Sequence, residues 1–504
     1  MYNLLLGVQN VMQPEVLLAL FGGTVFGFVV GVMPGLTGNM AIALSVPFTF
    51  AMSPVAGLAF LSAIYCSAMF GGAVTSILLG IPGTISNFPT ILDGYPMAKA
   101  GKAGTALGIA TISSAFGGLF SAVVLMSLTP MLADFALQFG PAEYFAIAAL
   151  GLSCIANIGG GSVLKGLLAG AIGLLIACIG MDPQTGYARY TFGSINLLDG
   201  VGLVPALIGI FAVVSVLKSA EECKKVQAVS MPDVSSLWIG WRQCASLLPT
   251  WLRGSVIGTV IGIIPGPGTS VATFMAYDME KKISADPDTF GKGNPKGVAA
   301  PESANNALAG GSLVPLLALG VPGNATSALF LGAIMFHGIR TGPVFFIEHP
   351  DVIYGLFAAF FIANLIMAPL GLFLLRYMKA VLSIPESLLG GIILAFCATG
   401  VFAIRGNPFD VLVVIVFGLL GYLFYKIDMP TAPLIIAIVL GPMAETNLRM
   451  ALVVSRGSWN FLYTRPITLA MMIIAVLSFC IPLFSAILSK YKTGRAANKD
   501  AAGK

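Results

Sequence analysis

Long apolar runs alternate with short polar connections along almost the whole chain. Runs long enough to span a bilayer, which takes about 20 residues, recur about a dozen times. They lie near residues 14–33, 54–80, 103–128, 142–160, 162–180, 199–217, 254–276, 303–336 (interrupted), 352–375, 384–404, 408–426, 431–453 and 466–489. In lipid every backbone group must be satisfied within the protein, which favours helices. The pattern therefore predicts an all-α integral membrane protein with about 12 transmembrane segments.

Composition agrees with this prediction and excludes a mainly soluble protein. Of the 504 residues, 57% are hydrophobic and only 9% are charged, whereas soluble domains carry about 25% charged residues. The longest polar stretches are residues 218–253, 280–300 and the tail from 490, so no soluble domain of usable size remains. The net charge of +5 reflects Lys and Arg in loops and requires no nucleic-acid partner.

Two stretches of the chain repeat each other at glycine and proline. Gly31-Val-Met-Pro-Gly-Leu-Thr-Gly-Asn39 returns as Gly262-Ile-Ile-Pro-Gly-Pro-Gly-Thr-Ser270, with an offset of 231 residues. Gly80-Ile-Pro-Gly-Thr84 returns as Gly320-Val-Pro-Gly-Asn324, with an offset of 240 residues. Helix breaks inside a membrane persist only where they line a cavity or are buried in protein. Matching breaks in two halves of the chain indicate a transport site.

Charges in the loops predict the topology of the two halves. Lys and Arg mark the cytoplasmic side, which places the tail from 490 and the segments 218–253 and 281–296 inside the cell. Residues 254–279 then form a re-entrant hairpin with Pro265-Gly266 at its tip, or alternatively one kinked spanning helix. Equivalent loops of the two halves carry opposite charge bias, which is typical of inverted-topology repeats.

We divide the chain accordingly into four parts. The first membrane repeat covers 1–217, a cytoplasmic connecting segment covers 218–253, the second repeat covers 254–489, and a cytoplasmic tail covers 490–504. The N-terminus lacks a basic region and a clear cleavage site, so no signal peptide is expected.

Each Pro-Gly break is followed by a small polar cluster. Thr, Ser and Asn are preferred N-caps, and a helix that starts in mid-membrane directs free N–H groups and its positive dipole end toward the break. Four such ends in two matched pairs favour a site that binds a carboxylate without a buried Arg, although a single cluster by itself is better explained as a helix cap. The candidate substrate-binding residues are Pro34, Gly35, Thr37, Gly38, Asn39, Gly83, Thr84, Ser86, Asn87, Gly266, Gly268, Thr269, Ser270, Gly323, Asn324, Thr326 and Ser327.

Pro301-Glu-Ser-Ala-Asn-Asn306 is a second candidate site. Glu302, Asn305 and Asn306 are three and four residues apart and share one side of a helix. Such groups coordinate Na⁺ or relay a proton, which makes these three the candidate ion-coupling residues, with Na⁺ at Asn305 and Asn306. Alternatively, Pro301 and Glu302 simply start a helix. The aligned stretch of the first half, Leu61-Ser-Ala-Ile-Tyr65, has no matching carboxylate.

The remaining charges and motifs indicate no other chemistry. Isolated charges such as Asp93, Glu143 and Asp410 lie at the ends of predicted segments, which favours the membrane interface. The chain has only two histidines and lacks His-Glu-x-x-His, Gly-x-Ser-x-Gly and Walker motifs. We therefore expect no enzyme activity, no cofactor and no ATP-driven pumping, which leaves coupling to an ion gradient or to a partner.

These same residues resemble the TctA family, the large membrane subunit of tripartite tricarboxylate transporters. The resemblance covers nearly the whole chain and departs from the common pattern at Thr37-Gly38-Asn39. It is carried by the repeated Pro-Gly motifs, Leu92-Asp-Gly-Tyr-Pro-Met-Ala-Lys99, Tyr277, Glu280-Lys281, Phe290-Gly291, Gly297 through Asn306, and His337-Gly338.

The resemblance implies a transporter of the bacterial inner membrane that imports citrate-like di- or tricarboxylates with Na⁺ or H⁺. It also implies two partners, a small membrane subunit resembling TctB and a periplasmic solute-binding protein resembling TctC. Two alternatives stay open: a carboxylate carrier that needs no partner, and a subunit that supports transport without performing it.

Overall fold

The computed structural model describes residues 2–33, 36–155, 162–182, 184–221, 237, 239–266, 268–378, 381 and 386–480. The chain forms two compact units. Unit 1 consists of residues 1–137 and 202–422, and unit 2 of residues 138–201 and 423–504. The matched breaks all lie in unit 1.

Unit 1 begins with helices interrupted where the sequence predicts. They are α1 (Tyr2–Val11), α2 (Pro14–Val32), α3 (Gly38–Thr49), α4 (Pro54–Leu79), η1 (Ile85–Asn87), α5 (Phe88–Met97), η2 (Ala98–Lys102) and α6 (Ala103–Ala136). The predicted break between α2 and α3 and the break after α4 are thus present.

The same order of helices returns later in unit 1. After α10 (Leu203–Ile208), η4 (Gly209–Val213) and α11 (Val214–Glu221), the elements are α12 (Trp241–Ile263), α13 (Gly268–Ile283), η5 (Pro287–Thr289), α14 (Pro295–Leu319), α15 (Ala325–Phe336), α16 (Pro343–Glu348), α17 (Pro350–Leu374), η6 (Leu375–Tyr377), α19 (Glu386–Arg405) and α20 (Pro408–Lys426). The long helices α4 and α14 both end at a left-handed glycine, Gly80 (φ 67°) and Gly320 (φ 76°), a conformation that other residues rarely adopt.

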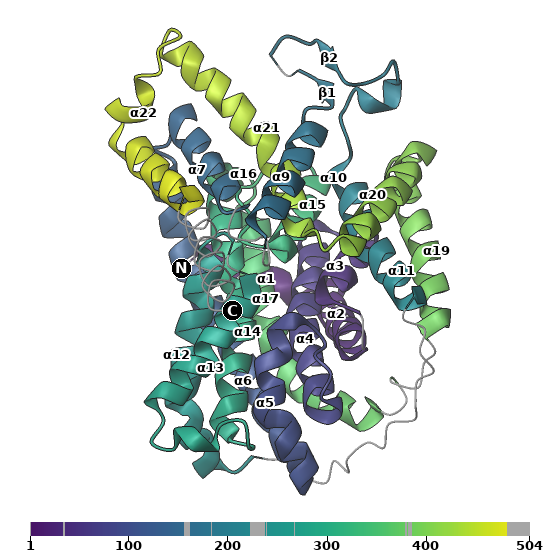
Figure 1. The fold of residues 1–504 in the computed structure, drawn as a ribbon, viewed down its shortest axis with the longest axis vertical. Helices are drawn as coiled ribbons and strands as arrows, with labels where there is room; N and C mark the ends of the chain where they lie inside the picture. Colours follow the sequence, from purple (N-terminus) through teal and green to yellow (C-terminus); the bar gives the residue numbers. More distant parts are fainter. Residues whose placement is uncertain are drawn as a thin grey trace, which may run out of the picture. The chain divides into compact units, whose positions relative to one another are not determined.

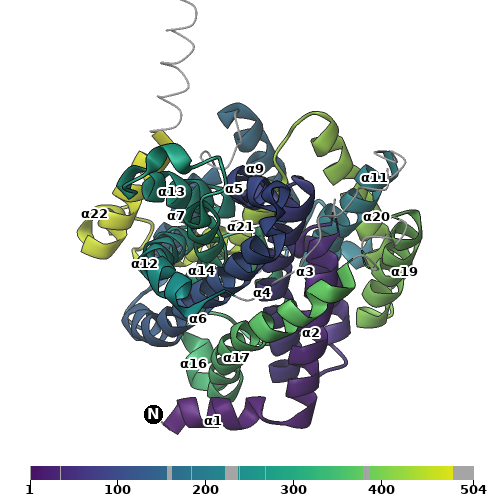
Figure 2. The same ribbon diagram turned by 90° about the horizontal axis from the view of Figure 1, so that it is seen from below.

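Rows of glycine hold each first helix against its long helix. A Cβ atom at Gly27 of α2 would lie 2.7 Å from Ile64 Cα of α4. A Cβ atom at Gly258 of α12 would lie 2.8 Å from Ala304 Cα of α14. Gly27 and Gly258 are equivalent by the first offset, and Ile64 and Ala304 by the second. Small residues let membrane helices approach closely, so the repeat in sequence is also a repeat in packing. Figure 2 shows that α12, α13 and α14 lie close together.

Helices α12 and α13 pack side by side and are joined by the turn at Pro265-Gly266 (Figure 1). The predicted start of the hairpin at residue 254 is too late, because α12 begins at Trp241 and continues through Arg253. The Arg253 guanidinium donates to both carboxylate oxygens of Glu280 in α13, with Nη2 2.8 Å from each. This ion pair neutralises the charge of Arg253, which lies directly before the predicted apolar run that begins at residue 254.

Replacing Glu280 with Leu should destabilise the α12–α13 pair. Glu280 also accepts a hydrogen bond from Thr250 Oγ1 at 2.8 Å, so the change leaves two donors without a partner. Hydrogen bonds to charged groups contribute about 1.5–3 kcal/mol, which should appear as a lower melting temperature in detergent. Glu348→Leu, at an exposed position, is the control and should melt as the unaltered protein does.

Unit 2 contains α7 (Pro141–Ser153), α9 (Val163–Ala177), a hairpin of β1 (Gly180–Met181) and β2 (Ala188–Arg189), η3 (Ile195–Leu197), α21 (Thr431–Val454), α22 (Phe461–Thr464) and the helix Pro466–Cys480. Strands β1 and β2 are antiparallel, with Gly180 opposite Arg189. Backbone N–H groups of Gln184 and Thr185, and then the Arg449 guanidinium, lower the pKa of Asp182 to about 2. Because its usual pKa is about 3.9, the ionised carboxylate contributes its full stabilisation of the hairpin above that pH and loses it as pH falls through about 2.

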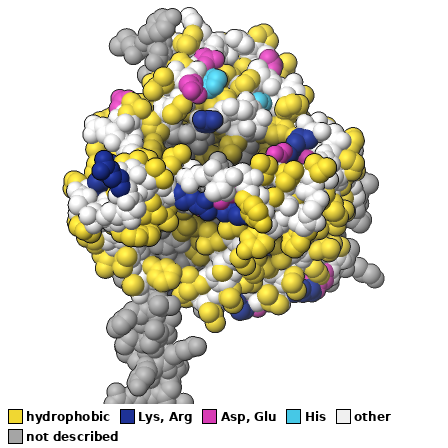
Figure 3. All heavy atoms as spheres, turned by 90° about the horizontal axis from the view of Figure 1, so that it is seen from above, with side chains coloured by type: hydrophobic (Ala, Val, Ile, Leu, Met, Phe, Trp, Pro, Cys, Tyr) yellow, Lys and Arg dark blue, Asp and Glu magenta, His cyan; other side chains and the backbone are white. Residues whose placement is uncertain are grey.

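The helices are suited to a membrane. Among the described residues, eight helices are long and apolar enough to cross a bilayer, and four shorter apolar helices accompany them. Hydrophobic side chains cover much of the surface in Figure 3, and charged side chains gather in a few groups. The protein is therefore an all-α, multi-pass membrane protein, as the hydropathy pattern predicts.

Candidate functional site

The first-repeat break joins α4 to α5 through a polar turn. Thr84 Oγ1 lies 2.7 Å from Ser86 Oγ and donates a hydrogen bond to Asn87 Oδ1 at 2.7 Å. Thr84 does not cap a helix N–H group, unlike the prediction, because its hydroxyl is engaged by these side chains. Gly83 lies against α4, where an added Cβ atom would come within 2.5 Å of Gly72 Cα.

Glu302 of the second repeat meets this turn. Its carboxylate is fully buried and accepts three hydrogen bonds, from Thr90 Oγ1 (2.5 Å), Ser114 Oγ (3.0 Å) and Asn87 Nδ2 (3.4 Å). Helix α14 begins at Pro295, so Pro301 and Glu302 lie inside the helix and do not start it. Glu302 therefore does not serve as a helix-capping charge.

The donors around Glu302 are all neutral. No Lys or Arg forms an ion pair with it within the part of the chain that the structure describes. A buried carboxylate is costly unless it is paired or hydrogen-bonded. The three donors suit the ionised form, which only accepts hydrogen bonds, and they leave its negative charge uncompensated.

The second-repeat break has its own polar cluster. Asn324 caps α15 by accepting the Ser327 N–H at 2.8 Å, while its Nδ2 donates to Tyr65 Oη at 3.1 Å. Thr326 Oγ1 donates to Asn39 Oδ1 of α3. Gly323 lies at the base of this cluster, where its carbonyl accepts the Gly266 N–H at 3.3 Å.

The two helix pairs at the first break of each repeat, α2–α3 and α12–α13, are here called hairpins. They contribute unequally to these clusters. Thr37 caps α3 by accepting the Met40 N–H at 3.3 Å, which confirms that predicted cap. Helix α3 begins at Gly38 and packs on α15, while α13 begins at Gly268 and packs on η1. Thr269 and Ser270 lie in the first turn of α13, and Pro34 and Gly35 lie outside the described residues.

The predicted residues thus gather in two groups. The first-break group contains Thr84, Ser86, Asn87 and Glu302, and the second-break group contains Asn39, Asn324, Thr326 and Ser327. Each hairpin lies against the break of the other repeat, so both groups are built from both halves of the chain.

Asn305 and Asn306 are buried on α14 beside Glu302. Both side-chain atoms of Asn305 and Oδ1 of Asn306 have no hydrogen-bond partner in the structure. Asn306 Nδ2 lies 3.4 Å from the Cys66 carbonyl oxygen of α4 and 3.5 Å from Met367 Sδ. Buried polar groups are usually satisfied, so these unpartnered atoms keep Asn305 and Asn306 as candidate binding residues.

Asp93, for which the sequence predicts a position at the membrane interface, is completely buried in the protein. Its Oδ1 accepts the N–H groups of Gly291, Gly293 and Asn294 at 2.7–2.9 Å, and its Oδ2 accepts the Tyr277 hydroxyl at 2.8 Å. These backbone donors hold the loop that leads into α14. Glu143 and Asp410 are also buried, and Arg465 and Arg405 respectively pair with them.

Sequence reasoning missed Thr90, Ser114 and Tyr65. Ser and Thr in membrane helices commonly bond to their own backbone, as Ser113 does to Ile109 O at 2.6 Å, so nothing local distinguishes Ser114. Tyr65 had a usable signal, since it stands at the position equivalent to Asn305 by the offset of 240 residues.

Matching helix breaks in two repeats of a membrane protein are typical of secondary transporters. The chain belongs to the tripartite tricarboxylate transporter TctA family, whose family model matches residues 17–436. This is a family of transporters, and membership implies a membrane subunit of a tricarboxylate transporter.

Two relatives from Agrobacterium vitis are similar to this chain. One, described as an uncharacterized 52.8 kDa protein in the TAR-I ttuC' 3' region, is 38% identical over 488 residues, which cover 97% of each chain. Another, an uncharacterized protein in the TAR-II ttuC' 3' region, is 39% identical over 233 residues, which cover 46% of this chain and 96% of the relative. No solved structure matches the chain.

Proposed function

We propose that this chain is the large subunit of a binding-protein-dependent secondary transporter that imports citrate-like di- or tricarboxylates with Na⁺ or H⁺. The observation that carries the proposal is the buried Glu302. It lies at the interface of the two repeats, bonded to the turn that carries the candidate substrate residues. The coupling ion binds at Glu302 and the substrate binds at this turn, so the same hydrogen bonds connect the two binding events.

The breaks favour an anionic substrate. Helices α3, α5, α13 and α15 all begin at them, and the first N–H groups of a helix have no intrahelical partner. Together with the positive dipole end, they stabilise a carboxylate. The surrounding hydroxyl and amide groups donate further hydrogen bonds without an attractive charge that would hold the substrate too tightly.

Glu302, Asn305 and Asn306 are the proposed coupling residues. The neutral hydrogen-bond donors around Glu302 do not compensate its negative charge. A proton on the carboxylate, or a Na⁺ ion beside it, does so. Amide oxygens such as the unpartnered Asn306 Oδ1 are ligands of hard cations. The ion neutralises Glu302 when substrate is bound, which lowers the cost of moving both across the membrane.

The proposal includes two partners and a location. A TctB-like membrane subunit and a TctC-like periplasmic binding protein complete the system in the bacterial inner membrane, with the C-terminus in the cytoplasm. The basic residues of the tail and of the 281–296 segment support this orientation.

The test is uptake of labelled citrate into proteoliposomes that contain this chain, its membrane partner and the binding protein. Uptake should require all three proteins and a Na⁺ or H⁺ gradient. Equal uptake by this chain alone would establish the self-sufficient carrier, and uptake by the membrane partner alone would reduce this chain to a supporting subunit.

A further inference from the structure

A chain of hydrogen bonds joins the first-repeat break to the buried Glu302. Thr84 Oγ1 lies 2.7 Å from Asn87 Oδ1, and Asn87 Nδ2 lies 3.4 Å from Glu302 Oε1. Ser86 Oγ joins the same chain, 2.7 Å from Thr84 Oγ1. Asn87 and Glu302 are fully buried, whereas Thr84 is partly exposed. Thr84 is therefore the member of the chain that an arriving substrate contacts, and Asn87 stands between it and the carboxylate.

The donors in this chain all point toward Glu302. A carboxamide oxygen only accepts, so the hydroxyl hydrogen of Thr84 is directed to Asn87 Oδ1. Because a hydroxyl group has a single hydrogen, the bond between Ser86 and Thr84 is donated by Ser86. Hydrogen bonds in such a chain polarise one another. In this arrangement the two hydroxyl groups offer a substrate carboxylate only lone pairs.

Asn87 does not act as the helix cap that its position predicts. It directly precedes α5, where Asn is a preferred cap, yet its side chain bonds to no N–H group of that helix. The offset of 240 residues relates Thr84, Asn87 and Glu302 to Asn324, Ser327 and Ser62. Asn324 and Ser327 cap α15 reciprocally, and Ser62 donates to a carbonyl of its own helix. The first-repeat break thus directs to a buried carboxylate the side chains that cap a helix at the other break.

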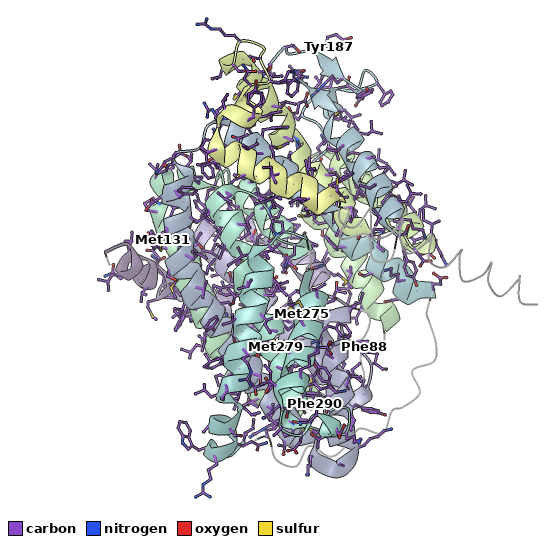
Figure 4. The ribbon with its side chains drawn as sticks, turned by 60° about the vertical axis from the view of Figure 1, so that its left-hand side comes forward. Phe88, Met131, Tyr187, Met275, Met279 and Phe290 are labelled. Carbon is purple, nitrogen blue, oxygen red and sulfur yellow. The ribbon has the colours of Figure 1, made fainter. Side chains whose placement is uncertain are left out.

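The Asn87 amide is enclosed between two helices. It lies against α4 at Gly72, where an added Cβ atom would collide with Asn87 Oδ1. Helix α13 covers the other side of the turn, and Figure 4 shows the next residue, Phe88, near Met275 and Met279 of that helix. Within this enclosure, a half-turn of the amide about its last bond exchanges the places of its oxygen and its nitrogen.

Glu302 carries the charge to which this amide responds. Among the described residues, the buried ionisable groups on the helices packed against α14 are Tyr65, Cys66, Asp93, Tyr277 and Glu280. Asp93 accepts the Tyr277 hydroxyl, and Glu280 pairs with Arg253. The remaining ionisable side chains of those helices in the described ranges are partly or fully exposed. The groups that bond to Glu302 are the neutral side chains of Thr90, Ser114 and Asn87.

We propose that Asn87 is a positioning residue that transmits cation binding at Glu302 to the substrate site by reversing this chain of hydrogen bonds. The inference rests on the proposed function and names the residue through which the coupling ion favours the substrate. Asn87, which the sequence predicts as a substrate-binding residue, acts through Thr84 and does not itself touch the acid.

A cation reverses the chain because it attracts the amide oxygen. A proton on Glu302 donates to Asn87 Oδ1, and Na⁺ at the carboxylate attracts the same oxygen. Asn87 Nδ2 then donates to Thr84 Oγ1, which frees the Thr84 hydroxyl hydrogen for a substrate carboxylate. Cation and carboxylate therefore favour each other's binding, and this coupling is reciprocal.

The experiment is counterflow of labelled citrate into citrate-loaded proteoliposomes that contain the complete system. The concentration of H⁺ or of Na⁺ is varied, equally on both sides of the membrane, and the apparent KM for citrate is measured at each value. Ionisation of citrate changes equally for every variant, so the comparison between variants isolates the effect of the protein.

Three variants define the role of Asn87. Asn87→Leu keeps the size of the side chain but neither donates nor accepts, and Thr84→Ser keeps the hydroxyl group at the outer end of the chain. Asn447→Leu is the control, since the Asn447 amide is half-buried and donates to its own helix at Met443 O over 2.8 Å. Melting temperatures establish that each variant is folded.

The readout is the dependence of KM on the cation. For the unaltered protein, KM should fall by up to about tenfold for each tenfold rise in the coupling cation, and the cation that has this effect identifies the coupling ion. Asn87→Leu should still exchange citrate, with a KM that changes less than about twofold over the same range. Thr84→Ser and Asn447→Leu should keep the dependence. A merely structural role of Asn87 would shift KM equally at every cation concentration.

The other outcomes separate this inference from the proposed function. If folded Asn87→Leu keeps the cation dependence of the unaltered protein, or loses counterflow at every concentration, the inference is wrong while the proposed function stands. If counterflow by the unaltered protein ignores both cations, the inference and the assigned ion coupling are wrong. If the unaltered system shows no citrate counterflow under any condition, the inference and the proposed function are both wrong.

Discussion

Replacing Glu302 with Gln is expected to abolish gradient-driven accumulation while leaving the protein folded. Gln keeps the size of the side chain but removes the charge that a proton or Na⁺ compensates. Removing a charged hydrogen-bond partner costs about 1.5–3 kcal/mol, and 1.4 kcal/mol is a factor of ten in an equilibrium constant. Initial uptake of labelled acid under a gradient should fall at least about tenfold.

Two measurements separate coupling from folding in this variant. Exchange of labelled for unlabelled substrate without a gradient needs no net ion movement, so Glu302→Gln should retain much of it. Glu348→Gln, at an exposed carboxylate, should behave as the unaltered protein in both assays. Full gradient-driven uptake by Glu302→Gln would show that this carboxylate has no part in coupling.

Replacing Gly258 with Val should prevent α12 from packing on α14. The first added carbon would lie within 2.8 Å of Ala304 Cα and closer still to the Ala304 carbonyl oxygen, so the two backbones must separate. Overpacking of a close contact costs about 1–3 kcal/mol or more. We expect a sharply reduced yield of monodisperse protein and a lower melting temperature.

The chain offers a matched control for this change. Gly391 lies in the apolar helix α19, and an added Cβ atom there would meet nothing within 4 Å. Gly391→Val should therefore leave yield and melting temperature nearly unchanged. Equal behaviour of the two variants would contradict the claim that the glycine rows set the distance between the paired helices.

The breaks were predictable because their signal is local. A Pro-Gly pair inside apolar sequence favours a helix break, and two such pairs at constant offsets identify the repeat, whereas single prolines such as Pro301 and Pro315 stay inside α14. The left-handed ends of α4 and α14 at Gly80 and Gly320 follow the same rule. The N-caps at Thr37 and Asn324 also form as predicted.

The pairing of the clusters was not predictable, since it depends on how the repeats pack. No local pattern indicates that Glu302 reaches Thr90 and Ser114, which lie 212 and 188 residues away in sequence. The partners of Asp93 were not predictable for the same reason, because the backbone donors that stabilise its burial come from a loop about 200 residues later. Arg253 lies directly before the predicted apolar run that begins at residue 254. Helix α12 nevertheless includes Arg253, because Glu280 on the adjacent helix pairs with it.

The repeat symmetry recovers part of what local reasoning missed. An alignment of the two halves places Tyr65 opposite Asn305, a candidate site residue. This correspondence identifies Tyr65 as a residue to examine, which no local pattern does.

The central claim is that substrate crosses the membrane through the broken helices of this chain. Counterflow tests it most directly: proteoliposomes with the complete system are loaded with unlabelled citrate-like di- and tricarboxylates, and entry of the same labelled acids is followed without an ion gradient. We predict rapid entry of the labelled acids into proteoliposomes that hold the complete system. Absence of counterflow for every carboxylate by a folded, complete system would contradict the account and leave the breaks as features of packing.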